Sequence, residues 1–243
     1  MSAFAKFVFS GEPFLALFLC QFVNRGYTMN HTIAIDGTAG SGKSTLGKAL
    51  AQKLGYFFLD TGLLYRAISR QSLNSKIDIH DEVAINDYAE NLELTVQELH
   101  PKFRFELNGV RVTDLYAVEI DRIVPIVASY EMIRLKVRDI QRKIANEGNI
   151  ILAGRDIGSV VLPDAEFKFY IEVSLDERAN RRFYAQNEAQ RTLLDIRDDL
   201  IERDKKDKNR HISPLKIASD AIVIHTDGLS IEDAVSKIIS HIG

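Results

Sequence analysis

The segment 37–44 has the residue types and spacing of a phosphate-binding loop. Its sequence, Gly-Thr-Ala-Gly-Ser-Gly-Lys-Ser, fits the pattern G-x-x-x-x-G-K-[ST]. The glycines let backbone N–H groups converge on phosphate oxygens, Lys43 adds a positive charge, and the Ser44 hydroxyl can bind Mg²⁺. We therefore expect a nucleoside triphosphate site made of Gly37, Thr38, Ala39, Gly40, Ser41, Gly42, Lys43, Ser44 and Thr45.

A phosphate loop alone does not separate a kinase from a GTPase switch or an ATPase motor. The sequence has no N-K-x-D guanine motif and no D-x-x-G switch at a suitable spacing. Instead, Arg66 follows the loop at residues 60–62, and Arg155 and Asp156 follow a later core strand. These arginines could form surface or buried ion pairs, or they could bind an anionic phosphoryl acceptor.

Two basic segments near the C-terminal half favour a lid. Arg178, Arg181 and Arg182 are spaced i, i+3, i+4 and so share one helix face, and residues 202–210 read E-R-D-K-K-D-K-N-R. One interpretation is a solvated helix surface with internal ion pairs. The other is a mobile lid whose arginines neutralise charge on the transferring group and whose closure excludes water.

The elements that must position these residues alternate between strands and helices. We expect core strands at 32–36, 56–59, 150–153, 167–173 and 221–225, and helices at 44–54, 63–73, 121–129 and 132–146. This order is typical of an α/β fold with a parallel, doubly wound sheet and helices on both faces. Ligands of such sheets bind at the carboxyl ends of the strands, near Asp36, Asp60, Arg155 and Ser174.

A small antiparallel insert interrupts this alternation. Apolar and polar residues alternate at 92–96 and 103–107, and Asn108-Gly109 then predicts a tight turn into residues 110–112.

Composition limits the classes of protein. A chain of 243 residues, 46% of them hydrophobic, is long enough for one domain with small inserted lobes. The formal charge of −3 argues against a nucleic acid polymer as partner.

Cys20 is the only cysteine, which excludes a disulfide framework and suits the reducing cytoplasm. The apolar run at 14–20 is shorter than the ~20 residues of a membrane helix, so we expect no membrane partner. We also expect a cytoplasmic monomer.

Residues 1–28 differ in composition from the rest and form an N-terminal extension. Six phenylalanines lie among them, and the start is weakly charged with no small-x-small cleavage site for a signal peptide. Met29 lies four residues before the strand that begins at Ile33. We therefore favour translation from Met29, with the domain proper at 29–243.

Four motifs together resemble the bacterial cytidylate kinase family. They are I-A-I-D-G-T-A-G-S-G-K-S-T, L-D-T-G-L-L-Y-R, G-R-D-I-G-S-V-V-L-P-D-A and E-R-D-x-x-D-x-x-R, and the resemblance runs from about Ile33 to the C-terminal helix. It implies a P-loop NTPase sheet, a nucleoside-monophosphate-binding lobe at about 62–146 and a helical lid at about 178–212. It also implies transfer of the γ-phosphate of Mg·ATP to CMP or dCMP, a step of pyrimidine nucleotide metabolism.

The resemblance assigns roles by position. Ser129, Arg138 and Asp156 would surround the cytosine, where the carboxylate accepts from N4–H₂ and uracil would leave it unpaired. The acceptor phosphate would be held by Thr61, Arg66, Arg155, Arg203 and Arg210, with Asp207 at the ribose. Catalysis would rest on Lys43, Arg155, Arg178 and Arg182, and metal binding on Ser44.

Two alternative functions stay open, and a departure from the family supports one of them. The family usually has an acidic residue before Gly154, where this chain has Ala153, so metal binding could be weaker. A kinase for UMP or for a metabolite such as shikimate is one alternative. A nucleotide-binding regulator without catalysis is the other, and Ala153 is its only support.

Overall fold

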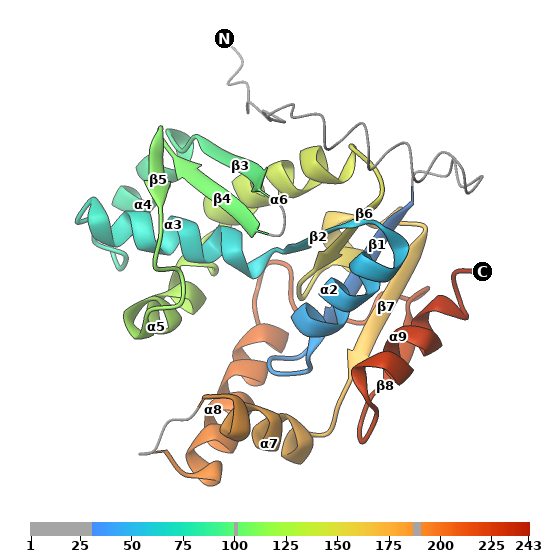
Figure 1. Cartoon of the computed structure of the whole chain (residues 1–243). Coiled ribbons are helices and arrows are strands. Elements are labelled where there is room, and N and C mark those ends of the chain that lie inside the picture. Colours follow the sequence, from blue (N-terminus) through green and yellow to red (C-terminus); the bar gives the residue numbers. More distant parts are fainter. Residues whose placement is uncertain (1–30, 100–101, 187–190) are drawn as a thin grey trace. The chain divides into compact units, whose positions relative to one another are not determined.

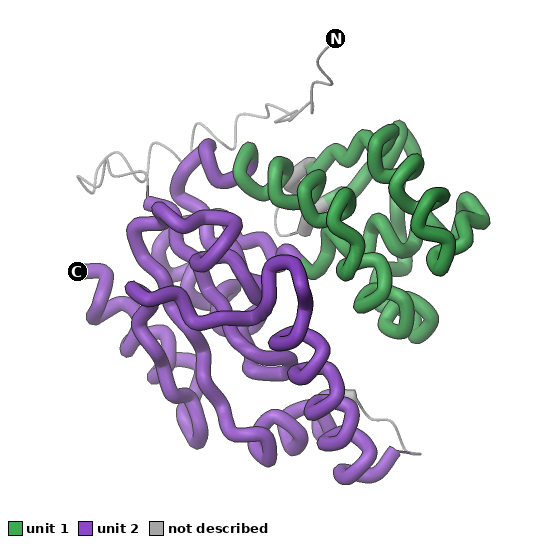
Figure 2. The backbone as a smooth tube through the Cα atoms, turned by 180° about the vertical axis from the view of Figure 1, so that it is seen from behind, with its two compact units in different colours: residues 1–30, 62–143 green, residues 31–61, 144–243 purple. Residues whose placement is uncertain are grey.

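The computed structural model describes residues 31–99, 102–186 and 191–243; the predictions for residues 1–28 lie outside this range. The described chain divides into two compact units (Figure 2). Unit 1 contains Gly62–Lys143, and unit 2 contains His31–Thr61 and Ile144–Gly243.

Unit 2 is built on a five-stranded sheet with the order β2-β6-β1-β7-β8 (Figure 1). All four pairings between neighbouring strands are parallel. The strands are β1 (Thr32–Gly37), β2 (Phe57–Asp60), β6 (Ile150–Ala153), β7 (Phe167–Glu172) and β8 (Ile222–His225). The predicted α/β fold with a parallel sheet is confirmed, because each of the predicted apolar runs forms one of its strands.

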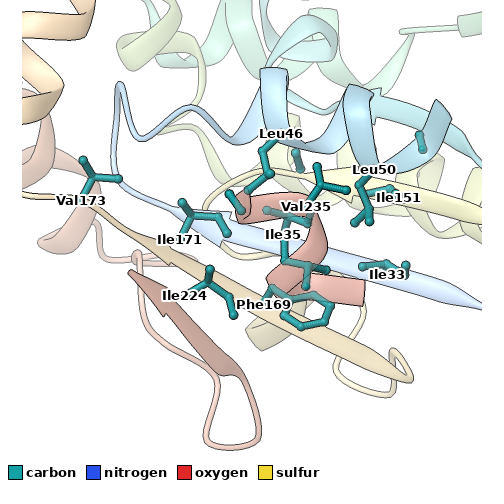
Figure 3. Close-up of a cluster of buried hydrophobic side chains, with 14 residues drawn as sticks. Ile33, Ile35, Leu46, Leu50, Ile151, Phe169, Ile171, Val173, Ile224 and Val235 are labelled. Carbon is teal, nitrogen blue, oxygen red and sulfur yellow. The ribbon is translucent and has the colours of Figure 1, made fainter. Parts of the chain in front are cut away.

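Two helices pack on this sheet through one apolar core. They are α2 (Lys43–Leu54) and α9 (Ile231–Ile239), which contact each other. The core contains side chains from four strands and from both helices (Figure 3). Among them are Ile33, Ile35, Leu50, Ile151, Phe169, Ile171, Ile224 and Val235. Helix α2 ends at Gly55, which has a positive φ of 71° that glycine adopts without strain. This stop lets the chain turn directly into β2.

Two further helices, α7 (Leu175–Gln186) and α8 (Leu193–Lys208), contact each other in unit 2 where the sequence predicts a lid. Helix α8 begins with a capping box in which Thr192 and Asp195 satisfy each other's backbone N–H groups. A single π-helical turn, η1 (Ile157–Val161), follows β6 and was not predicted. None of the described helices is long and apolar enough to cross a membrane.

Unit 1 holds the antiparallel insert. Its strands β3 (Leu94–Leu99), β4 (Lys102–Leu107) and β5 (Val110–Val112) pair in sequence order. Asn108 and Gly109 have φ values of 50° and 77°, as a tight hairpin turn requires. The predicted insert is therefore confirmed.

Four helices complete the described part of unit 1: α3 (Gly62–Asn74), α4 (Glu82–Glu90), α5 (Val118–Val127) and α6 (Glu131–Ala145), whose last two residues belong to unit 2. Helix α4, capped by the Asp81 side chain, was not predicted. The helix predicted at 121–129 instead begins at Val118 and contains Pro125 in its interior.

Candidate active site

The phosphate loop joins the end of β1 to the start of α2, as predicted. Gly40 and Gly42 have φ values of 74° and 84°, which other residues rarely adopt. Gly37 allows a close approach, since a Cβ atom there would lie 2.5 Å from the carbonyl oxygen of Ile171. The loop therefore needs its glycines for its shape. Thr45, at the first turn of α2, is exposed.

Lys43 lies inside this loop and is buried. Its Nζ donates to the carbonyl oxygen of Thr38 at 2.6 Å and to Oγ of Ser41 at 3.1 Å. Burial lowers the pKa of Lys43 well below its usual value, and the charge of Arg155 acts in the same direction. A bound phosphate would raise this pKa again, because an opposite charge favours the ammonium form. Binding of an anion and the positive charge of Lys43 would therefore favour each other.

Ser44 and Asp60 supply oxygen atoms suited to a magnesium ion. The Ser44 hydroxyl donates to Oδ2 of Asp60 at 2.5 Å. Mg²⁺ prefers such hard oxygen donors and usually takes only one or two carboxylates, with phosphates and water completing its shell. Asp60 is the register partner of Ala153, the position where the family usually has an acid. The residues present thus fit Mg²⁺, although the described chain has no cluster of three metal-ligating His, Cys, Asp or Glu side chains.

Asp36, the fifth residue of β1, holds the start of η1. Its carboxylate accepts the N–H groups of Ile157 at 2.9 Å and Gly158 at 2.7 Å. Burial raises the pKa of Asp36 to about 6, against the lowering effect of these two hydrogen bonds. Because η1 directly follows Arg155 and Asp156, Asp36 fixes the loop that carries two predicted acceptor-site residues.

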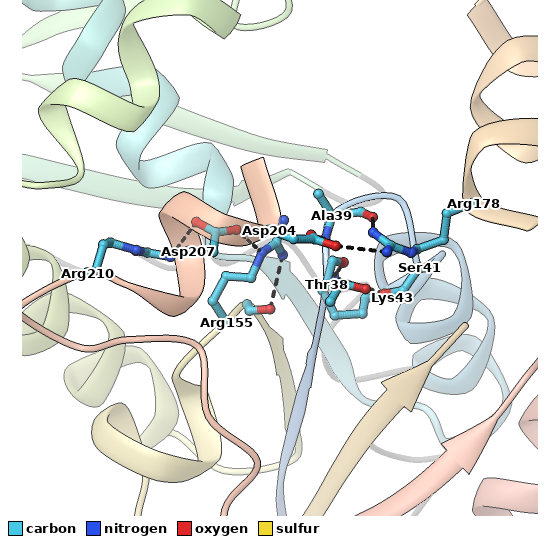
Figure 4. A network of polar contacts seen from close by, with 10 residues as sticks. Thr38, Ala39, Ser41, Lys43, Arg155, Arg178, Asp204, Asp207 and Arg210 are labelled. Carbon is cyan, nitrogen blue, oxygen red and sulfur yellow. Dashed lines mark hydrogen bonds and ion pairs between the residues drawn. The ribbon is translucent and has the colours of Figure 1, made fainter. Parts of the chain in front are cut away.

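Asp207 brings together two of the arginines assigned to the acceptor phosphate. Its Oδ2 accepts from Nε of Arg155 at 2.9 Å, and its Oδ1 accepts from an Nη atom of Arg210 at 2.6 Å (Figure 4). Arg203, one turn earlier on α8, is half-buried. Thr61 is buried and donates to the carbonyl oxygen of Ala153 at 2.8 Å. The carboxylate predicted at the ribose therefore also orients two arginines that are predicted to bind the phosphate.

Three predicted acceptor residues lie in unit 1. Arg66 on α3 donates to the carbonyl oxygen of Leu115 at 2.9 Å and forms an ion pair with Asp121. Ser129, between α5 and α6, donates to the carbonyl oxygen of Ile126 at 2.6 Å. Arg138 on α6 has a buried Nε atom with no hydrogen-bond partner in the described chain. Their joint action with residues of unit 2 stays a prediction.

Arg178 lies against the phosphate loop. Its Nη1 donates to the carbonyl oxygen of Ala39 at 2.8 Å, and its Nη2 forms an ion pair with Oδ2 of Asp204 at 2.8 Å. Arg182, further along α7, is half-buried. Arg181 bonds Glu177 and the carbonyl oxygen of Thr226. The direct contact of Arg178 and Arg182 with a transferring phosphoryl group stays a prediction.

Sequence reasoning missed the roles of Asp36 and Asp204. Asp204 belongs to the E-R-D-x-x-D-x-x-R motif but received no role, although it is among the few buried charged residues of the described chain. Its membership of the motif was the only signal in the sequence. Asp36 was placed near the chemistry only because it ends a strand.

Comparisons with known proteins identify the family. The cytidylate kinase family model matches residues 33–243. The curated cytidylate kinase of Desulfitobacterium hafniense is 40% identical over 87% of this chain and 92% of its own length, and that of Herpetosiphon aurantiacus is 42% identical over 89% and 96%. The solved shikimate kinase of Bacteroides thetaiotaomicron covers 87% of this chain and 98% of its own at 14% identity and a TM-score of 0.48, too weak a likeness to carry an argument. The chain belongs to the cytidylate kinase family.

Proposed function

We propose that this protein transfers the γ-phosphate of ATP to CMP and dCMP, forming CDP and dCDP. The observation that carries the proposal is the phosphate loop in a chain that the cytidylate kinase family model matches from residue 33 to residue 243. Lys43 of this loop is already held among its backbone and hydroxyl oxygens. We further propose that the protein acts in the cytoplasm as a monomer.

The donor side is the phosphate loop at the start of α2. Residues 37–45 would bind the phosphates of ATP through backbone N–H groups, with Lys43 against the β- and γ-phosphate oxygens. Ser44 and Asp60 would hold Mg²⁺, which would neutralise phosphate charge when it is bound. The short hydrogen bond between these two side chains supports this assignment, because it places their oxygen atoms side by side.

The acceptor side would bind the phosphate and the base of CMP. Arg155 and Arg210, both oriented by Asp207, are suited to the phosphate, because a guanidinium group matches phosphate oxygens in a bidentate manner. The family resemblance adds Thr61, Arg66 and Arg203 to this group. It assigns the cytosine to Ser129, Arg138 and Asp156, whose donor and acceptor groups match cytosine and not uracil.

The proposed reaction needs no general base. An oxygen of the CMP phosphate is already anionic near neutral pH and can attack the γ-phosphorus in line with the leaving ADP. Catalysis then consists of positioning and of electrostatic stabilisation. Lys43, Arg155 and Arg182 would supply positive charge to the transferring group, and Arg178 would do so from its place against the phosphate loop, where it bonds Ala39 and Asp204.

An ADP-release assay tests the proposal. With Mg·ATP as donor, we would offer CMP, dCMP, UMP, AMP, GMP and shikimate in parallel. Rapid turnover with CMP and dCMP and little with the others is expected. Equal turnover with UMP would reject the cytosine assignment, and turnover with shikimate alone would reject the nucleotide acceptor. A folded protein that binds ATP but releases no ADP would support the regulator instead.

The Lys43→Ala variant tests the phosphate loop. We expect a loss of at least about a hundredfold in kcat, since the lysine contacts the oxygens on which charge develops. Lys48→Ala on the exposed face of the same helix is the matched control and should retain activity. Near-normal turnover by Lys43→Ala would contradict the assignment.

A further inference from the structure

We infer that Asp204, acting with Arg178, positions the tip of the phosphate loop for the triphosphate. Asp204 is thus a positioning residue of the donor site, distinct from the neighbouring Arg203 and Asp207, which serve the acceptor. The inference rests on the proposed function only for the identity of the nucleotide. It is supported by hydrogen bonds and an ion pair that all lie within unit 2.

Asp204 and Arg178 both form hydrogen bonds with the backbone of one residue of the loop. Oδ1 of Asp204 accepts the N–H of Ala39 at 3.3 Å, while Nη1 of Arg178 donates to the carbonyl oxygen of the same residue at 2.8 Å. The two side chains bond each other at 2.8 Å (Figure 4). Arg178 and Asp204 are only 5% and 9% exposed, so water competes little for these bonds.

A single peptide group of the loop bonds both Asp204 and Lys43. The N–H and C=O of a trans peptide point in opposite directions. The N–H of Ala39 points to Asp204, and the C=O of Thr38 in the same peptide accepts from Nζ of Lys43 at 2.6 Å. Asp204 therefore helps to orient the carbonyl group that holds the loop lysine.

Arg178 acts on the next peptide in the same way. It holds the carbonyl oxygen of Ala39, which directs the N–H of Gly40 to the opposite side, away from Arg178. In phosphate loops such N–H groups bind the triphosphate. The ion pair thus fixes the orientation of two consecutive peptides at the tip of the loop.

Apolar packing keeps the ion pair in place. Ala39 packs in a buried cluster with Ala179 of α7 and with Ile196 and Leu200 of α8. A Cβ atom on Gly40 would lie 3.5 Å from Cδ2 of Leu200, so the loop rests closely on α8. A buried ion pair alone is weak evidence for stability, since apolar replacements are often tolerated. A positioning role explains its contacts with the loop, and it can be separated from stability by experiment.

Binding of ATP in the absence of any acceptor provides the test. We would measure the Kd for Mg·ATP by calorimetry and the thermal midpoint for Asp204→Asn and for the double variant Arg178→Met/Asp204→Leu. Glu202→Gln, which alters an exposed ion pair with Lys206 on the same helix, is the control. We expect Asp204→Asn to weaken ATP binding about tenfold and Glu202→Gln to leave it unchanged.

The double variant separates positioning from stability. It leaves no unpaired charge buried, so its thermal midpoint should recover toward that of the unaltered protein. Its ATP affinity should stay about tenfold weaker, because neither peptide is held. ATP binding equal to that of the unaltered protein would overturn the inference, even if Asp204→Asn does not fold. A protein that binds ATP but phosphorylates no CMP would reject the proposed function and leave this comparison intact.

Discussion

The hydroxyl of Ser44 donates a 2.5 Å hydrogen bond to the carboxylate of Asp60, which joins the phosphate loop to the end of β2. Asp60 pairs in register with Ala153, so its carboxylate lies on the strand next to the position that is usually acidic in the family. In the proposed magnesium site, Asp60 would therefore supply the carboxylate that position 153 lacks. The carboxylate is present on the neighbouring strand.

We therefore predict that Asp60→Asn weakens the use of magnesium. The Mg²⁺ concentration for half-maximal activity should rise about tenfold, since an amide oxygen is a weaker ligand than a carboxylate. The measurement is a magnesium titration at saturating ATP and CMP, together with calorimetry of Mg·ATP binding. Adding Ala153→Asp to this variant should lower the required Mg²⁺ concentration again. An unchanged magnesium titration in Asp60→Asn would refute this role.

Asp156 should determine the choice between CMP and UMP. Its carboxylate can accept from the amine of cytosine, whereas the carbonyl at the same position of uracil would leave it unpaired. Asp156→Asn supplies an N–H donor for that carbonyl, so the ratio of kcat/KM for UMP to that for CMP should rise about a hundredfold or more. Asp164→Asn, in the exposed turn after η1, is the matched control. An unaltered ratio in Asp156→Asn would remove this residue from the cytosine site.

The elements with a local signal could be predicted from the sequence. The glycine spacing at 37–44, the apolar strands and the Asn108-Gly109 turn each specify their structure within a few residues, and all are found. Helix α4 was missed because it is only nine residues long, and its start depends on the side chain of Asp81. Its place is set by burial of Ile85 and Ala89 in the folded unit.

The contacts that shape the candidate site could not be predicted, because they join distant parts of the chain. Asp204 bonds Ala39 across 165 positions, and Asp36 bonds Ile157 across 121. The motifs indicated which segments of the chain form the candidate site, but not which atoms of these segments form hydrogen bonds. The arginines of α7 show the same limit: their spacing predicts a shared helix face, but not that Arg178 is buried against the loop.

The buried carboxylate of Asp36 should make folding stability depend on pH. Burial raises its pKa from 3.8 to about 6; the charge of Asp156 acts in the same direction, while Lys43 and two backbone N–H groups oppose it. The folded state thus binds the proton more tightly than the unfolded state. The contribution of Asp36 to the free energy of unfolding is greatest below about pH 4, falls between about pH 4 and 6, and is constant above.

Asp36→Asn should remove this dependence, because the amide does not ionise. The free energy of unfolding of the unaltered protein minus that of the variant should fall by roughly 2.5 kcal/mol from about pH 4 to 7, at about 1.4 kcal/mol per pKa unit. Denaturant unfolding at a series of pH values measures this difference and cancels the titration of all other groups. A difference that stays constant with pH would show that Asp36 titrates normally.

Gly47 of α2 should resist replacement by alanine, although alanine favours helices. Exchanging glycine for alanine inside a helix usually stabilises it by about 1 kcal/mol. Here a Cβ atom would lie 2.2 Å from Cε2 and 2.8 Å from Cδ2 of the Phe58 ring, which must then move. Such overpacking costs about 1–3 kcal/mol. We therefore expect Gly47→Ala to lower the free energy of unfolding in denaturant titrations.

A second substitution tests whether the Phe58 ring is the cause. Phe58→Leu in the Gly47→Ala background removes the ring atoms nearest to the new methyl group, so part of the lost stability should return. The effects of the two single changes should accordingly be non-additive, since the residues are in contact. Because Phe58 lies two residues before Asp60, Gly47→Ala should also raise the Mg²⁺ requirement. Additive stability changes would mean that strain arises elsewhere in α2, not at this ring.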